Sequence, residues 1–225
     1  MENSQKTNVI IGIFFSILVL LASMTFLPLL KNLNIDKETT FWIGRIAIWI
    51  CLLLVFLYAN QIENQKFLLW NEQQLSILEY GKSFFKIIAS IIIGALLIRL
   101  LLYLLGGNVE ENPKLKEIVA VMKTNFPLLV FTCLTAAFTE ELIFRGYLMP
   151  RLQMFFKNNY ASIAISSLLF GALHFGYGTL FQILGPMVIG LIFAIHYQKF
   201  RNIKILIFCH FFWDFISLMV ASNLK

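Results

Sequence analysis

The chain has 225 residues, of which 59% are apolar, 15% aromatic and 13% charged, and its formal net charge is +6. Soluble domains are about 45–50% apolar and about 25% charged, so this composition excludes a disordered chain, a collagen-like repeat, a disulfide-stapled secreted module and most soluble enzymes. The apolar residues form long blocks with Lys and Arg between them, which predicts an integral membrane protein rather than a nucleic-acid binder. The three cysteines, Cys51, Cys133 and Cys209, lie inside apolar blocks without CxxC spacing, so neither a disulfide framework nor a thiolate metal site is expected.

A bilayer core about 30 Å thick needs roughly 20 apolar residues of helix. Seven segments meet this requirement, and the predicted spans are 8–30, 41–60, 83–106, 120–149, 160–176, 183–199 and 203–221. Pro127 interrupts the fourth segment, so eight spans remain an alternative. We therefore expect an all-α, polytopic membrane helix bundle that forms a single domain over residues 1–225.

The charged residues in short connections predict how the bundle is oriented. Loops rich in Lys and Arg face the cytoplasm. They are found after the fourth span (Arg151 and Lys157, with Arg145 just before the loop) and after the sixth (Lys199, Arg201, Lys204). Counting back through seven spans places the N-terminus in the cytoplasm of a multi-pass cell-membrane protein, although Lys114, Lys116 and Lys123 then lie on the other side. We expect Arg45 and Arg99 to snorkel or to bind lipid headgroups. The content of Asn, Lys, Ile and Phe suggests a bacterial chain.

Ionisable residues within the spans carry the functional prediction, because charge in a membrane is costly and marks function by default. The fourth span contains Glu140, Glu141 and Arg145 as E-E-x-x-x-R. Glu141 and Arg145 are i,i+4 on a helix and can pair. Glu140 is rotated about 100° from its neighbour, which leaves its carboxylate free for other work.

Two later spans add His174 and the i,i+4 pair His210 and Asp214. With a rise of 1.5 Å per residue, Glu140, His174, His210 and Asp214 fall within about 10 Å of a common depth, which is compatible with one shared site. A carboxylate and an imidazole can activate a water while a second histidine stabilises an oxyanion, which would hydrolyse a peptide bond. Glu140, His174 and His210 are equally a possible zinc ligand set, and the spacing does not separate the two mechanisms.

These three motifs, E-E-x-x-x-R, F-x-x-x-H at Phe170 and His174, and H-x-x-x-D at His210 and Asp214, together resemble the CPBP family. That family contains the CAAX prenyl endopeptidases and the bacteriocin-processing and immunity proteins, also called the Abi family. The resemblance covers roughly residues 125–220. It implies an all-helical intramembrane endopeptidase, of a kind often described as a metalloprotease, whose cavity opens to the cytoplasm.

By the same resemblance, Glu140 and His174 would activate the water, His210 and Asp214 would stabilise the oxyanion, and Glu141 and Arg145 would support the site. The family's last motif residue is often Asn, whereas Asp214 donates a hydrogen bond only when it is protonated.

The leading functional prediction is an endopeptidase that cleaves a peptide or protein in or on the membrane, near the cytoplasmic face. The expected partners are that substrate and the lipid bilayer, without nucleic acid. The alternative is a non-catalytic protein of the same family that confers bacteriocin self-immunity or regulates another membrane protein. A small transporter is disfavoured because the sequence has no inverted repeat.

Overall fold

The computed structural model describes residues 3–30, 34–106 and 112–223, and the regular structure in these ranges is entirely helical. The predicted all-α fold is therefore confirmed. The long helices are α1 (Asn3–Leu30), α2 (Lys37–Gln61), α3 (Ile77–Leu104), α5 (Phe126–Glu141), α7 (Asn159–Leu173), α8 (Phe181–Phe200) and α9 (Ile203–Asn223). Shorter elements are α4 (Pro113–Thr124), the π-helical segment η2 (Leu142–Leu148), α6 (Met149–Phe156) and the 3₁₀ turn η3 (Phe175–Tyr177).

The described chain contains seven helical segments that are long and apolar enough to cross a membrane. They are Ser4–Ser23, Lys37–Gln61, Ile77–Leu104, Phe126–Phe156, Asn159–Tyr177, Phe181–Phe200 and Ile203–Ser222. They correspond one for one to the seven predicted spans, so the chain is a multi-pass membrane protein. The fourth segment runs through α5, η2 and α6 as one crossing, and the alternative of eight spans is not found among the described residues.

The start of the fourth span differs from the prediction, which placed it at residue 120 with a possible break at Pro127. Residue 120 belongs to the separate helix α4, and Asn125 divides α4 from α5. The Asn125 side chain caps α5 by accepting a hydrogen bond from Leu128 N at 2.9 Å. Pro127 lies in the first turn of α5, where its missing N–H costs no helical hydrogen bond, so it begins a helix instead of interrupting one.

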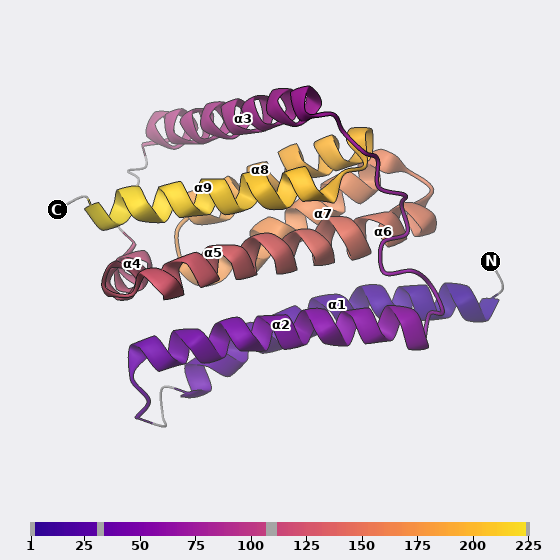
Figure 1. The fold of residues 1–225 in the computed structure, drawn as a ribbon, viewed down its shortest axis with the longest axis horizontal. Coiled ribbons are helices and arrows are strands. Elements are labelled where there is room, and N and C mark those ends of the chain that lie inside the picture. The colour runs from indigo at the N-terminus through magenta and orange to yellow at the C-terminus, as the bar shows by residue number, and fades with distance from the viewer. Residues whose placement is uncertain (1–2, 31–33, 107–111, 224–225) are drawn as a thin grey trace.

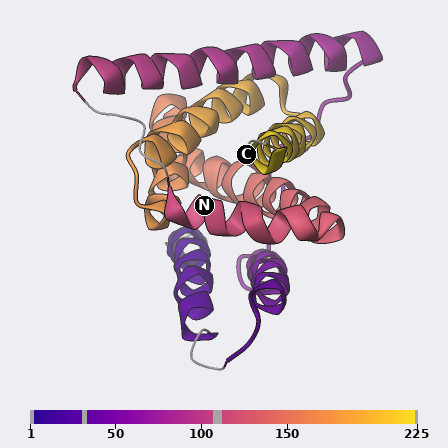
Figure 2. The ribbon, with the colours of Figure 1, turned by 90° about the vertical axis from the view of Figure 1, so that its left-hand side faces the viewer.

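The helices are arranged in three layers (Figures 1 and 2). The pair α1 and α2 forms one outer layer, and α5, α7, α8 and α9 form the middle layer. On the other side, α3 crosses the bundle against α8 and α9. The middle layer contains all three sequence motifs, so their side chains are enclosed between the two outer layers.

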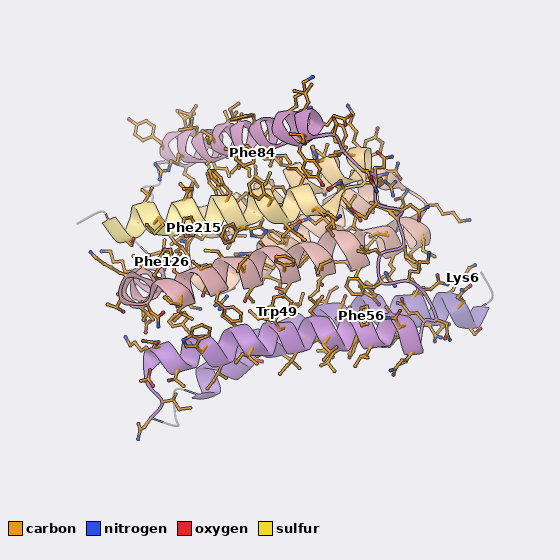
Figure 3. The ribbon with its side chains drawn as sticks, in the orientation of Figure 1. Lys6, Trp49, Phe56, Phe84, Phe126 and Phe215 are labelled. Atoms are coloured by element: carbon orange, nitrogen blue, oxygen red, sulfur yellow. The ribbon has the colours of Figure 1, made fainter. Side chains whose placement is uncertain are left out.

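Aromatic side chains join the layers, and Phe84 and Trp49, labelled in Figure 3, are two of them. Phe84 of α3 packs on Phe208 and Phe212 of α9, with ring centroids 5.5 and 5.0 Å apart. On the opposite side, the indole of Trp49 on α2 donates a hydrogen bond to Thr135 Oγ1 of α5 at 3.0 Å. These contacts fix α3 and α2 against the two helices that carry the motif carboxylates.

The connection between α2 and α3 is held by a buried ion pair that no pattern in the sequence indicated. Arg151, predicted to be a loop cation, lies in α6 and is fully buried. Its Nε donates to Glu63 Oε2 at 2.8 Å, and Tyr147 Oη donates to Glu63 Oε1 at 2.6 Å. A buried guanidinium is stable there because the carboxylate of Glu63 compensates its charge. Since Arg151 does not lie in a loop, it does not indicate which side of the membrane this end of the bundle faces.

The N-terminus and α4 lie at opposite ends of the bundle (Figure 1). The turns from α2 to α3, α6 to α7 and α8 to α9 share the N-terminal end, whereas α4, the α7–α8 connection and the end of α9 share the other. Exposed or half-buried cations at the N-terminal end are Lys6, Lys66, Lys82, Lys86, Lys157, Lys199, Arg201 and Lys204. In the described chain, the α4 end has Lys37, Lys114, Lys116 and Lys123, with Arg99 of α3 and Arg45 of α2 in the adjoining turns.

Candidate active site

The motif Glu140-Glu141-x-x-x-Arg145 lies where α5 passes into η2. The backbone widens there from α-helical to π-helical, a local change frequent at functional sites. Arg145 NH1 donates to Glu141 Oε1 at 2.9 Å, and both side chains are fully buried. The i,i+4 pair expected from the spacing is therefore present.

The remaining contacts of Arg145 fix its guanidinium within the middle layer. Its NH2 donates to the carbonyl of Gly190 on α8 at 3.1 Å. Its Cζ lies 4.4 Å from the centroid of the Phe170 ring and 5.5 Å from that of Phe193. A cation over aromatic faces is stabilised by the ring quadrupoles, so Arg145 ties η2 to α7 and α8 and holds the Glu141 side chain at a fixed position.

His210 is oriented by the same carboxylate. Its Nδ1 lies 2.8 Å from Glu141 Oε1, and because a carboxylate accepts, Nδ1 carries the hydrogen. The opposite nitrogen, Nε2, lies 3.4 Å from Asp214 Oδ2 and 3.9 Å from Glu140 Oε2. A lone pair on Nε2 would face two carboxylates, so a hydrogen on this nitrogen fits the geometry best. His210 is then a hydrogen-bond donor at both ring nitrogens.

Glu140 and Asp214 differ from Glu141 in their access to space. The side chain of Glu140 is 26% exposed and that of Asp214 is 31% exposed, whereas Glu141 is fully buried. Glu141 therefore has a structural position beneath the site, and Glu140 and Asp214 present carboxylate oxygens to a reactant. The division of roles between the two adjacent glutamates follows from this difference.

His174 is the C-cap residue that follows α7, and it has a defined tautomer. Its Nδ1 lies 2.8 Å from the carbonyl oxygen of Phe170, which can only accept, so Nδ1 carries the hydrogen and Nε2 of the neutral ring has a lone pair. The ring of Tyr177 in η3 stacks on the imidazole, with centroids 5.9 Å apart and an interplanar angle of 16°. Among the described residues, Nε2 of His174 has no hydrogen-bond partner.

One cavity of about 350 Å³ brings these groups together, because Glu140, His174, His210 and Asp214 all line it. The same cavity is lined by residues of α3, of α4 and of the first turns of α8, which include Ile98, Leu115 and Gln182. These residues belong to the half of the bundle next to α4 (Figure 1). The cavity therefore lies towards the end opposite to the N-terminus.

The side chains as arranged do not fit the zinc site that the spacing of the motifs left as an alternative. In the described part of the chain, no group of three or more His, Cys, Asp or Glu side chains is placed to hold a metal ion. His210 uses Nδ1 for Glu141 and turns Nε2 towards the carboxylates of Asp214 and Glu140.

Arg45 and Tyr177 are among the cavity residues that the sequence did not assign to the site. Arg45 of α2, expected to snorkel or to bind lipid headgroups, lines the cavity instead. Tyr177 also lines it, beside His174. A cation two turns inside an apolar span was visible in the sequence, but whether it faced lipid or protein depends on how α2 packs. No pattern in the sequence indicated a role for Tyr177.

The fold and these side chains define a class of protein, namely a multi-pass helical membrane protein with a carboxylate–histidine site enclosed among its spans. Residues 122–216 match the family model described as Type II CAAX prenyl endopeptidase Rce1-like. The match covers less than half of the chain and contains all three motifs. The resemblance to the CAAX protease family is confirmed over this segment. No curated protein and no solved structure matches the chain.

Proposed function

We propose that this chain is an intramembrane endopeptidase of the glutamate type, acting on a peptide or protein in or on the membrane. The observation that carries the proposal is the meeting of Glu140, His174 and His210 around one cavity, with Glu140 Oε2 3.9 Å from His210 Nε2. The family match supports proteolysis in general, and the side chains of the cavity determine which chemical steps are open to it.

The first step is the attack of water on the scissile carbonyl carbon. The Glu140 carboxylate accepts one proton of the water as general base, and the lone pair on His174 Nε2 accepts a hydrogen bond from the other. The water oxygen forms a bond to the carbonyl carbon, and the carbonyl oxygen becomes an oxyanion. The N–H at His210 Nε2 donates to this oxygen, as preorganised donors do in acyl transfer.

The second step breaks the carbon–nitrogen bond. Protonated Glu140 returns its proton to the leaving nitrogen, which departs as an amine, and the carbonyl re-forms as a carboxylic acid. One water and one peptide bond are consumed, one amine and one carboxylic acid are formed, and Glu140 returns the proton that it accepted, so no further reactant is needed. Asp214 acts as an acceptor for His210 Nε2 in the resting site, which departs from the oxyanion role that the family resemblance implied for this position.

Glu141 and Arg145 do not meet the water in this scheme. Glu141 holds the hydrogen of His210 Nδ1, and Arg145 neutralises Glu141 in a site without solvent. This assigns them the positioning role that the resemblance implied, because the direction of His210 Nε2 depends on the bond at Nδ1.

The side of the membrane at which cleavage occurs is constrained by the fold. A seven-span chain has its N-terminus and its α4 end on opposite faces, and the cavity belongs to the α4 end. A cytoplasmic N-terminus therefore places the α4 end of the cavity on the outer face, while Glu140 and Asp214 lie about midway along their spans. The excess of Lys and Arg at the N-terminal end favours a cytoplasmic N-terminus, whereas the family resemblance implies a cavity that opens to the cytoplasm. Maleimide labelling of cysteines placed at the two ends of the bundle determines the orientation.

The test uses purified protein in lipid vesicles with an internally quenched, apolar peptide in water enriched in ¹⁸O. Hydrolysis places one ¹⁸O atom in each new carboxyl group, which mass spectrometry detects. Glu140→Gln removes the base and is expected to lower the rate by about 10²–10⁴-fold. Glu38→Gln is the matched control, because Glu38 is an exposed glutamate at the start of α2, outside the cavity.

Cleavage at an unchanged rate by the Glu140→Gln variant would refute the mechanism. Absence of cleavage by the parental protein would favour the non-catalytic, immunity-type alternative. A chelator is expected to leave the parental rate unchanged, since the mechanism routes no step through a metal.

A further inference from the structure

Arg45 is the feature of the cavity that the mechanism leaves unused. It lies in α2 eight residues after Lys37, which places it about 12 Å along the helix from its start. It lines the same cavity as Glu140 and Asp214. It also lies outside residues 122–216, the segment that matches the protease family.

Among the residues that the structure describes, the guanidinium of Arg45 has no hydrogen-bond or ion-pair partner, and its Nε is buried in that state. Arg45 is half-buried, whereas Arg145 and Arg151 are fully buried and each pairs with a carboxylate, Arg145 with Glu141 and Arg151 with Glu63. An unpaired cation among membrane helices is costly and marks function by default.

The carboxylates that share the cavity are engaged elsewhere. Asp214 and Glu140 both face His210 Nε2, at 3.4 and 3.9 Å. Arg45 therefore faces the cavity with a free set of donors, in a fork geometry that matches a carboxylate. Most of the remaining lining is apolar, for example Ile91 and Ile98.

We propose that Arg45 binds a carboxylate of the peptide substrate and thereby selects which peptides enter the cavity. The carboxylate is either the C-terminus of the peptide or an acidic side chain beyond the scissile bond. This inference rests on the proposed function, because it assigns a ligand to the same cavity. It makes the preferred substrate an apolar peptide segment with one anionic group, recognised by a residue of the N-terminal helices.

The test measures binding, so that its outcome is separate from the outcome of the hydrolysis assay. The Glu140→Gln protein in lipid nanodiscs is titrated with three N-acetylated apolar pentapeptides. One has a free C-terminal carboxylate, the second a C-terminal amide, and the third a C-terminal amide and one internal glutamate. Loss of hydrogen bonds to a charged group corresponds to about 10- to 100-fold in Kd, so we expect the first or the third peptide to bind tighter than the second by this factor.

Substitutions at Arg45 then assign the discrimination to its guanidinium. Arg45→Gln, made in the Glu140→Gln background, should bind the three peptides with equal Kd. Arg45→Lys should retain part of the discrimination, because the charge remains without the fork. Arg99→Gln is the matched control, since Arg99 is an exposed arginine of α3 outside the cavity lining.

Equal Kd values for all three peptides in the protein with Arg45 would overturn the proposal. Unchanged discrimination in the Arg45→Gln protein would also overturn it, provided that size-exclusion chromatography shows that the variant is folded. If Arg45→Gln does not fold, the three peptides are titrated against Arg45→Lys instead. Discrimination among the peptides by Arg45→Lys equal to that of the protein with Arg45 would count against recognition through the guanidinium fork. Preference for the first over the third peptide identifies the C-terminus as the ligand, and the reverse identifies an acidic side chain.

Discussion

Replacement of Arg145 by Met is the most demanding test of the site's architecture. The substitution keeps a long, unbranched side chain among Phe170 and Phe193 but removes the donors to Glu141 and to the carbonyl of Gly190. Glu141 then remains fully buried with a carboxylate that only His210 contacts. The variant thus separates the charge of Arg145 from its volume.

The magnitude follows from the burial of both partners. Removal of one partner from a buried ion pair leaves an uncompensated charge and costs about 3–5 kcal/mol. Arg145 and Glu141 are both fully buried at 2.9 Å, but His210 still donates to Glu141 Oε1 at 2.8 Å, so the lower part of this range applies. Glu141→Gln combined with Arg145→Met removes both charges and keeps an oxygen that accepts from His210. We expect this double variant to regain most of the lost stability.

The assay is unfolding in mixed micelles with a rising fraction of sodium dodecyl sulfate, followed by tryptophan fluorescence. Two results would refute the reasoning. One is a free energy of unfolding for Arg145→Met within about 1 kcal/mol of the parental protein, below the range expected for a broken buried pair. The other is a double variant as unstable as the single one, since that would mean that volume and not charge is the cause.

Three further predictions test the site, the packing behind it and the topology. Asp214→Asn keeps an acceptor for the imidazole and adds a donor, so peptide hydrolysis should stay within about threefold of the parental rate, whereas Asp214→Ala should lower it about 10-fold. A Cβ on Gly171 would lie 2.7 Å from a side-chain carbon of α8, so Gly171→Ala should cost about 1–3 kcal/mol in micelle unfolding, while Gly81→Ala, with open space around it, should cost less than about 0.5 kcal/mol. Cysteines placed at Lys123 and Lys157 should react with a membrane-impermeant maleimide from opposite sides, against a background of buried native cysteines. Labelling of both from one side would contradict the fold.

Several parts of this molecule could be predicted from the sequence because the signals are local. A run of about 20 apolar residues is sufficient to identify a span, and the seven spans appear as predicted. The i,i+4 spacing is likewise sufficient to pair Glu141 with Arg145. The common depth of Glu140, His174 and His210 followed from helical rise alone, and the structure gathers them around one cavity.

Other parts depend on contacts that no local pattern encodes. Glu63 and Arg151 are separated by 88 residues, so their pairing could not be read from either segment. The tautomer of His174 depends on a hydrogen bond to the backbone carbonyl of Phe170. The sequence motif identifies the side chain of Phe170 and does not indicate this backbone contact. The sequence did not place Arg45 at the cavity because α2 is apolar on all sides, and the pattern of an apolar helix does not show which of its faces contacts protein.

The placement of Arg45 also indicates how chains with the same motifs can differ in their substrates. The groups proposed to perform hydrolysis all come from α5, α7 and α9, within the segment that matches the protease family. The cation proposed to select the substrate comes from α2, which lies in the outer layer and packs on α5. Because α2 contributes no group to the bond-breaking steps, a change at Arg45 should alter KM while kcat is preserved. Substrate choice can therefore diverge through the N-terminal helices without a change in the catalytic constellation.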